Sequence, residues 1–197
     1  MKHCMVWFFV VISSISLNAE WNSHEAGVQQ KFVSGGTIRL HLSAGGYTVS
    51  PNDSDSIVVT YHTDSAEQLS RVKVEIKPAS SSADIYVHGT PHSNFNATIE
   101  VPRRSNLWAR LTAGELDVED VEGDKDLEIW AGQIDLEIPH PEQYGHRDAS
   151  VLAGSVESSA FNISKGGLFR SFHEQGPGKY RLHTHVTTGE IDLHGTE

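Results

Sequence analysis

The chain has 197 residues and a formal net charge of −11 at pH 7 with its histidines neutral. Nucleic acids and anionic lipid surfaces are bound by clustered lysine and arginine, so this acidic balance disfavours nucleic acid and passive adsorption to a membrane. The length is sufficient for one domain with its own apolar core.

The amino terminus has the layout of a secretory signal peptide over residues 1–19. Lys2 gives a short polar start, residues 5–12 are almost wholly apolar, and Ala19 supplies a small residue at the expected cleavage position. The apolar run is shorter than the roughly 20 residues of a membrane-spanning helix, so we expect no stable membrane span after its removal. The sequence therefore predicts an exported protein, located in the periplasm, outside the cell or at the cell surface.

The only cysteine, Cys4, lies within this removable segment, so the mature domain, residues 20–197, has no disulfide. Such a domain depends on its core for stability. Export without disulfides is more typical of a bacterial envelope protein than of a small eukaryotic secreted one.

Residues 30–100 show the alternation of apolar and polar side chains that is typical of half-buried strands. Turn residues such as Gly35-Gly36 and Pro51-Asn52-Asp53 separate these segments. One short helical turn is expected at residues 64–70, with Asp64 as its cap. The predicted strands are 37–42, 56–61, 72–76, 84–87 and 97–101.

A short phrase recurs in the second half of the chain. Each copy has a small residue, a glycine and then alternating polar and apolar side chains, and the glycines are Gly114, Gly132, Gly154 and Gly189. A recurring strand of this kind predicts stacked units in a solenoid-like β architecture, because no single copy can bury its own apolar face.

The positions within one copy have distinct expected roles. The glycine should allow a tight corner that a side chain would obstruct. Leu116, Ile134, Val156 and Ile191 occupy the same position after it and should share one interior. The long gap between the third and fourth copies, around residues 166–172, should hold either another coil or an inserted hairpin.

The segment at residues 95–102, followed by 107–118 and the later glycine-containing copies, resembles the bacterial putative-adhesin family, described as auto-transporter-adhesin-like. The resemblance is best over residues 95–197. It implies an all-β fold at the cell envelope, a right-handed parallel β-solenoid-like stack of short strands with a more open β region toward the N-terminus. It implies no agreed catalytic residues. The third copy departs from the pattern, because Ser158-Ser159 replaces the apolar position after Glu157, so a uniform coil is not expected at residues 150–165.

Four acids occupy one outward position of the repeat. In stacked strands they would form a ladder of like charges, and directly opposed like charges repel one another. A bound calcium ion would relieve that repulsion. We favour a solvated acidic face, because the glycine-rich calcium-binding nonapeptide is absent. The four acids are Asp117, Asp135, Glu157 and Asp192.

Histidines offer a second set of possible ligands. His183 and His185 lie two apart in a predicted strand and should point to one face, and His194 could join them. Two such histidines can ligate zinc, but no third ligand is fixed by the sequence. A surface pair is the interpretation that we favour.

The aromatic residues allow two interpretations. Exposed aromatics on a flat β face would suit carbohydrate stacking or a protein interface. Trp130 is even-numbered like Ile134 and Leu136, which predicts the inner face instead. We therefore expect Trp130 and Phe161 to cap the core between coils.

No nucleophile elbow, metalloprotease helix, phosphate loop or dinucleotide fingerprint appears in the sequence. The sequence thus yields no catalytic, cofactor-binding or metal-binding residue and predicts no cofactor. We expect a non-catalytic, adhesin-like binding or scaffolding protein, whose partner is a glycan, the cell wall or an envelope protein. Two alternatives stay open: a polysaccharide-active lyase or hydrolase on a β-helix, and a passive scaffold stabilised by calcium.

Overall fold

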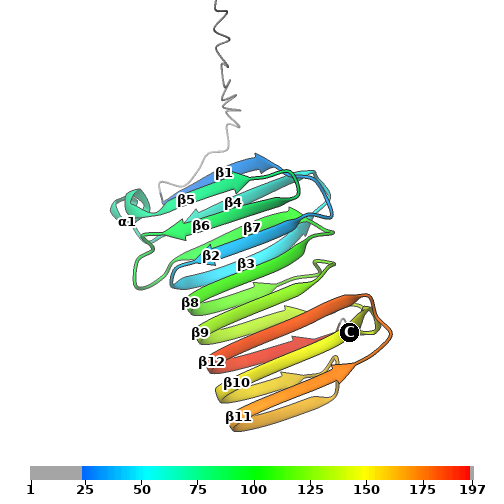
Figure 1. Ribbon diagram of the computed structural model, residues 1–197. Coiled ribbons are helices and arrows are strands. Elements are labelled where there is room, and N and C mark those ends of the chain that lie inside the picture. Colours follow the sequence, from blue (N-terminus) through cyan, green and yellow to red (C-terminus); the bar gives the residue numbers. More distant parts are fainter. Residues whose placement is uncertain (1–23, 196–197) are drawn as a thin grey trace, which may run out of the picture.

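The computed structural model describes residues 24–195, in which twelve strands form one mixed β-sheet (Figure 1). The predicted signal peptide, residues 1–19, lies outside the described residues. Within the described part, no helix is long and apolar enough to cross a membrane. The elements are β1 (Glu25–Lys31), β2 (Thr37–Leu42), β3 (Gly45–Asn52), β4 (Ser56–His62), α1 (Ala66–Arg71), β5 (Lys73–Pro78), β6 (Ser82–His88), β7 (Asn96–Pro102), β8 (Asn106–Val118), β9 (Lys125–Glu137), η1 (Pro141–Gln143), β10 (Tyr144–Ser158), β11 (Ile163–Gln175) and β12 (Tyr180–His194).

Four long strands, β8, β9, β12 and β10, form the parallel middle of the sheet in that spatial order (Figure 1). β12 pairs with β9 on one side and with β10 on the other, although β10 and β11 precede it in the chain. β2 and β3 together take the place of one long strand, since β2 pairs with the first half of β8 and β3 with the second half. The spatial order therefore departs from the chain order at β12.

The interior column predicted from the repeat is confirmed. Leu116 lies opposite Ile134, and Ile191 lies opposite both Ile134 and Val156. All four side chains are fully buried. Because burying one such side chain contributes roughly 1.5–3 kcal/mol, the column is a main source of the stability of the stack.

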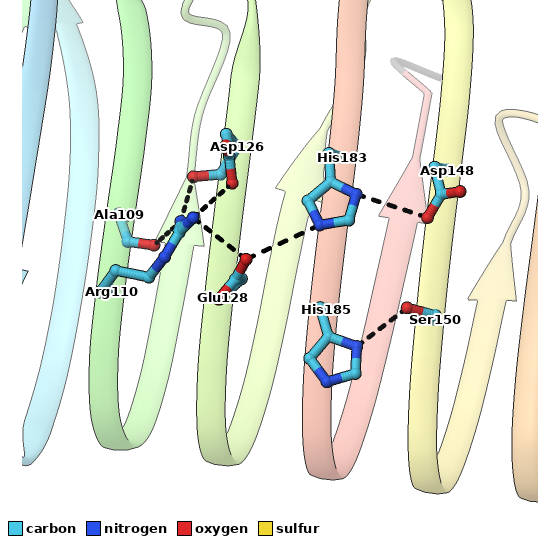
Figure 2. Close-up of polar contacts among 8 residues, drawn as sticks. All are labelled: Ala109, Arg110, Asp126, Glu128, Asp148, Ser150, His183 and His185. Carbon is cyan, nitrogen blue, oxygen red and sulfur yellow. Dashed lines mark hydrogen bonds and ion pairs between the residues drawn. The ribbon is translucent and has the colours of Figure 1, made fainter.

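A column of glycines crosses the stack where each long strand turns. In Figure 2 the strands curve at one end and continue behind themselves, so the half after the corner lies behind the half before it. Gly132 has a φ of 139°, and a Cβ atom there would lie 1.8 Å from the Gly114 carbonyl oxygen. No side chain fits, so the predicted tight corner is confirmed. In spatial order the column is Gly45, Gly114, Gly132, Gly189 and Gly154.

The corner shifts the alternation of inward and outward side chains. Ile129 and Ile134 are both buried, although they lie five positions apart, whereas Trp130 is 69% exposed. Inward residues of β9 are odd-numbered before the corner and even-numbered after it. The prediction that Trp130 lies on the inner face is therefore wrong. Phe161 does pack against the core, as predicted.

The all-β prediction is confirmed, but the sheet is not wholly parallel. Antiparallel pairs join β1 to β4, β4 to β7 and β5 to β6 in the N-terminal half. At the other end of the stack β11 pairs antiparallel with β10, so the gap between the third and fourth copies holds a hairpin. The helical turn is present as α1, but its N-cap is Ser65 rather than Asp64, because the Ser65 hydroxyl accepts a hydrogen bond from the Gln68 backbone N–H at 3.3 Å.

The irregular third copy keeps its register as far as Ser158. This serine lies opposite Leu193 and is buried. Its hydroxyl donates to the Leu193 carbonyl at 3.0 Å and accepts from the Phe161 N–H at 3.1 Å. These two bonds satisfy a hydroxyl that would otherwise be costly to bury. The departure from the repeat pattern falls where β10 ends, at Ser158.

Candidate functional site

The strand halves before the glycine corner present a continuous surface of outward side chains, which we name the outer face (Figure 2). Parallel register places equivalent residues of β8, β9, β12 and β10 side by side. One row holds Trp108, Asp126, His183 and Asp148, and the next holds Arg110, Glu128, His185 and Ser150.

Arg110 organises the β8 side of this face. Its Nη2 lies 2.9 Å from Asp126 Oδ1 and 3.0 Å from Glu128 Oε1. Its Nη1 donates to the backbone carbonyls of Ala109 and Asp126 at 2.9 and 3.0 Å (Figure 2). The guanidinium also lies 4.1 Å from the centre of the Trp108 ring. These contacts fix the side chain, and the two carboxylates more than offset its single positive charge.

His183 and His185 of β12 point to one face, as predicted, and that face is the outer face. His183 Nδ1 lies 3.4 Å from Asp148 Oδ1, and its Nε2 lies 3.8 Å from Glu128 Oε1 (Figure 2). His185 Nδ1 lies 2.9 Å from the Ser150 hydroxyl. The pair therefore takes part in side-chain contacts across the strands.

His194 does not join the β12 pair, because it follows the glycine corner and lies 3.1 Å from Asp135 in the other half of the stack. Asp126, Glu128 and His183 do bring ligand atoms within 4.8 Å of one another. The Arg110 guanidinium already lies against both of these carboxylates, so a metal ion there would have to displace it.

An apolar row borders the outer face beside the glycine corner. Trp130 of β9 is 69% exposed, Leu152 of β10 is 41% exposed and Phe169 of β11 is 77% exposed. Thr187 of β12 lies between Trp130 and Leu152 in the order of strands. Phe169 lies across from Leu152, between the pairs Val151–Arg170 and Ala153–Leu168. A contiguous patch of large, solvent-exposed apolar side chains is typical of interaction surfaces.

A shallow hollow of about 350 Å³ lies at the Trp130 end of this row. Its lining combines one indole ring with side chains that donate or accept hydrogen bonds. It is lined by Arg110, Leu111, Thr112, Glu128, Ile129, Trp130, His185 and Thr187. The sequence does hold a signal for this site. Gly132, two residues after Trp130, marks the corner at which the alternation of inward and outward side chains changes phase.

The half after the corner carries the predicted ladder of acids, with Asp117, Asp135, Asp192 and Glu157 in register. Burial, followed by the charges of Glu115, Asp135 and Glu119, raises the pKa of Asp117 to about 6. Burial also raises the pKa of Asp135, although His194 opposes the shift. The shared register of the four acids is thus confirmed. The face is less solvated than we expected, because three of the acids are half-buried and only Glu157 of the four is exposed.

A groove of about 880 Å³ follows the glycine column beside this ladder. Gly114, Gly132 and Gly189 lie along it, and Glu115 and Glu190 add carboxylates to its lining. The groove is therefore acidic. The outer face differs in that its carboxylates are paired with Arg110 and His183.

Removing the Asp117 charge should change how stability depends on pH. Its carboxyl keeps its proton up to about pH 6 in the folded chain, whereas the unfolded carboxyl releases it near pH 4. The folded state then binds more protons in this window, so this group's contribution to stability falls as pH rises from about 4 to 6. Asp117→Asn should flatten that fall and raise the melting temperature more at pH 7 than at pH 4. An identical shift at both pH values would contradict the assignment.

Lys125, the first residue of β9, is a buried cation. Its Nζ donates to the Val121 carbonyl at 2.5 Å and to the Tyr144 hydroxyl. Burial lowers its pKa to about 7, against the raising effect of the nearby acids, the largest being that of Asp120. The side chain is 2% exposed, so it holds the turn before β9 in place rather than meeting a ligand.

No family model matches the sequence, and no curated protein matches it. The fold does resemble solved structures. A crystal structure of a putative cell adhesion protein from Clostridium sporogenes ATCC 15579 is similar, with a TM-score of 0.56 and 10% sequence identity over 87% of this chain and 100% of that chain. At this identity the likeness concerns the fold alone.

A crystal structure of a putative adhesin from Bacteroides fragilis NCTC 9343 also matches, with a TM-score of 0.34, 10% identity and coverage of 89% of this chain and 98% of that one. The fold-level likeness rests on the Clostridium sporogenes structure, whose TM-score is 0.56.

Proposed function

We propose that this protein is an exported, non-catalytic binding protein of the adhesin type, which presents its outer face to a glycan, the cell wall or an envelope protein. The main support for this function is the exposed apolar row of Trp130, Leu152 and Phe169, which lies beside charged and polar residues. The signal-peptide pattern and the fold shared with the putative cell adhesion protein from Clostridium sporogenes support the same function.

We further propose that the parallel part of the sheet, β8, β9, β12 and β10, is a right-handed solenoid-like stack. The in-register glycine column and the shared interior support it. The position of β12 between β9 and β10 means that successive coils in space are not always successive in the chain. An experimental structure would give the hand of the turns directly.

The chemistry of the outer face favours binding over catalysis. Arg110 is held by two carboxylates, and His183 and His185 contact Asp148 and Ser150. Groups held in this way are preorganised to meet a ligand. The Ser150 hydroxyl does lie against the His185 imidazole, as a nucleophile lies against its base, but within residues 24–195 no carboxylate pairs with His185 to complete a catalytic triad. Incubation with acidic polysaccharides, followed by a search for unsaturated or shortened products, tests the proposal. Turnover would overturn the non-catalytic assignment.

Binding to isolated cell-envelope fractions tests the role of the apolar row. The double variant Trp130→Ser/Leu152→Ser should bind at least about tenfold more weakly, because both side chains would lie in the contact. Val33→Ser is the matched control, since Val33 is 68% exposed in the loop after β1. Equal loss in both proteins, or loss in neither, would count against the outer face as the binding surface.

One observation favours a second candidate, a scaffold stabilised by a metal ion. Asp135, Asp192 and His194 bring ligand atoms within 4.8 Å of one another in the acidic half. An imidazole suits zinc better than calcium, so this group fits the calcium of our earlier alternative poorly. The melting temperature should then rise with zinc and fall with chelator, and His194→Ala should abolish the rise. A melting temperature insensitive to zinc, calcium and chelator would remove this candidate.

A further inference from the structure

We propose that the hollow beside Trp130 binds a pyranose ring of a neutral glycan, with the indole as the stacking platform. This inference rests on the proposed function and assigns a ligand class to its surface. Trp130 is 69% exposed although its neighbour Ile129 is 1% exposed, so the ring stands clear of the core. A pyranose has one face of C–H groups, which suits an aromatic face, and an equatorial rim of hydroxyls, which suits polar neighbours.

The polar lining of the hollow matches such a rim. Arg110 offers guanidinium donors, Glu128 offers carboxylate acceptors, and His185 and two threonines offer groups that both donate and accept. Arg110 and Glu128 are already paired at 3.0 Å, so their positions are set before a ligand arrives. Binding then costs little side-chain entropy.

The charges around the hollow favour a neutral sugar over an acidic one. Arg110 is matched by Asp126 and Glu128, so the hollow has no surplus positive charge to hold a carboxylated or sulfated sugar. The net charge of −11 repels a polyanion as it approaches. A hollow of about 350 Å³ lies at the small end of ligand sites, which fits one or two rings rather than a large folded partner.

The apolar row extends this site along a chain of sugars. From Trp130 on β9 to Phe169 on β11 the row crosses β12 and β10, three strand spacings of about 4.8 Å each. Phe169 thus offers a second exposed ring roughly 14 Å away, with Leu152 between the two. An oligosaccharide that reaches both rings should bind more tightly than a single sugar, because the second contact is intramolecular once the first has formed.

The experiment is a titration of the purified protein with cellopentaose, chitopentaose, mannopentaose, glucose and a pentamer of galacturonic acid. Calorimetry gives the affinity, and the indole N–H resonance of Trp130, assigned by its absence in Trp130→Phe, reports the contact. At least one neutral pentamer should bind and shift that resonance, more tightly than glucose and more tightly than the acidic pentamer. Trp130→Ala should weaken binding about tenfold, Trp130→Phe less, and Val33→Ser not at all.

The outcomes separate this inference from the function on which it rests. If no neutral glycan binds while envelope fractions still bind through the outer face, the pyranose site is overturned and the binding function stands. If a glycan binds equally to wild type and Trp130→Ala, the ligand class survives but the site is overturned. If Trp130→Ala turns a dimer into a monomer in sedimentation without affecting glycans, the row is a contact between copies. If neither glycan nor envelope fraction binds, the proposed function fails with it.

Discussion

Replacing Gly132 by alanine is expected to abolish the native fold, with a loss in the free energy of unfolding greater than about 4 kcal/mol. The new Cβ atom would lie 1.8 Å from the Gly114 carbonyl oxygen, and φ at this residue is 139°. Relief requires β8 and β9 to separate, which would break their hydrogen bonds and open the interior column. Thermal and urea unfolding followed by circular dichroism measure the loss.

Gly166→Ala is the matched control for this substitution. Gly166 also lies within a strand of the stack, but no heavy atom lies within 4 Å of a Cβ built there. Its substitution should change the free energy of unfolding by no more than about 0.5 kcal/mol. Similar losses in the two variants would show that the glycine column is not what sets the corner.

Leu136→Ala should destabilise the protein by roughly 2–5 kcal/mol, since this side chain is fully buried in the stack and its loss leaves a cavity. Asp135→Asn, one residue earlier, should have an effect within about 0.5 kcal/mol. The Asp135 carboxylate points outward, and its ion pair with His194 at 3.1 Å is partly exposed. Urea unfolding of both variants at pH 7 provides the comparison, and equal effects would refute the assignment of inner and outer faces.

The interior of the stack could be predicted from sequence because its signal is local. Alternation after each glycine fixes which side chains point inward, and Leu116, Ile134 and Ile191 meet as that pattern requires. The same logic failed at Trp130, two residues before Gly132. The corner changes the phase of the alternation, so a face deduced on one side cannot be extended to the other. The candidate site lies just before the corner, and for this reason the sequence assigned its tryptophan, Trp130, to the core.

The order of the strands could not be predicted for a different reason. Gly132-Gln133-Ile134-Asp135-Leu136 and Gly189-Glu190-Ile191-Asp192-Leu193 carry nearly the same pattern, so either fits beside any other copy. A repeated pattern specifies how a strand pairs but not with which neighbour. The contacts of the outer face depend on that choice, since His183 meets both Glu128 and Asp148 because β12 lies between β9 and β10.

The place of β12 also governs when the molecule can assemble. The position between β9 and β10 is filled only after residues 180–194 have been synthesised. Until then the growing chain lacks the strand that joins the two parts of the core. Long-range pairing of this kind is slow and comes late in folding. Closure of the core therefore awaits β12, and a chain cut short before residue 180 would lack the strand that joins β9 to β10.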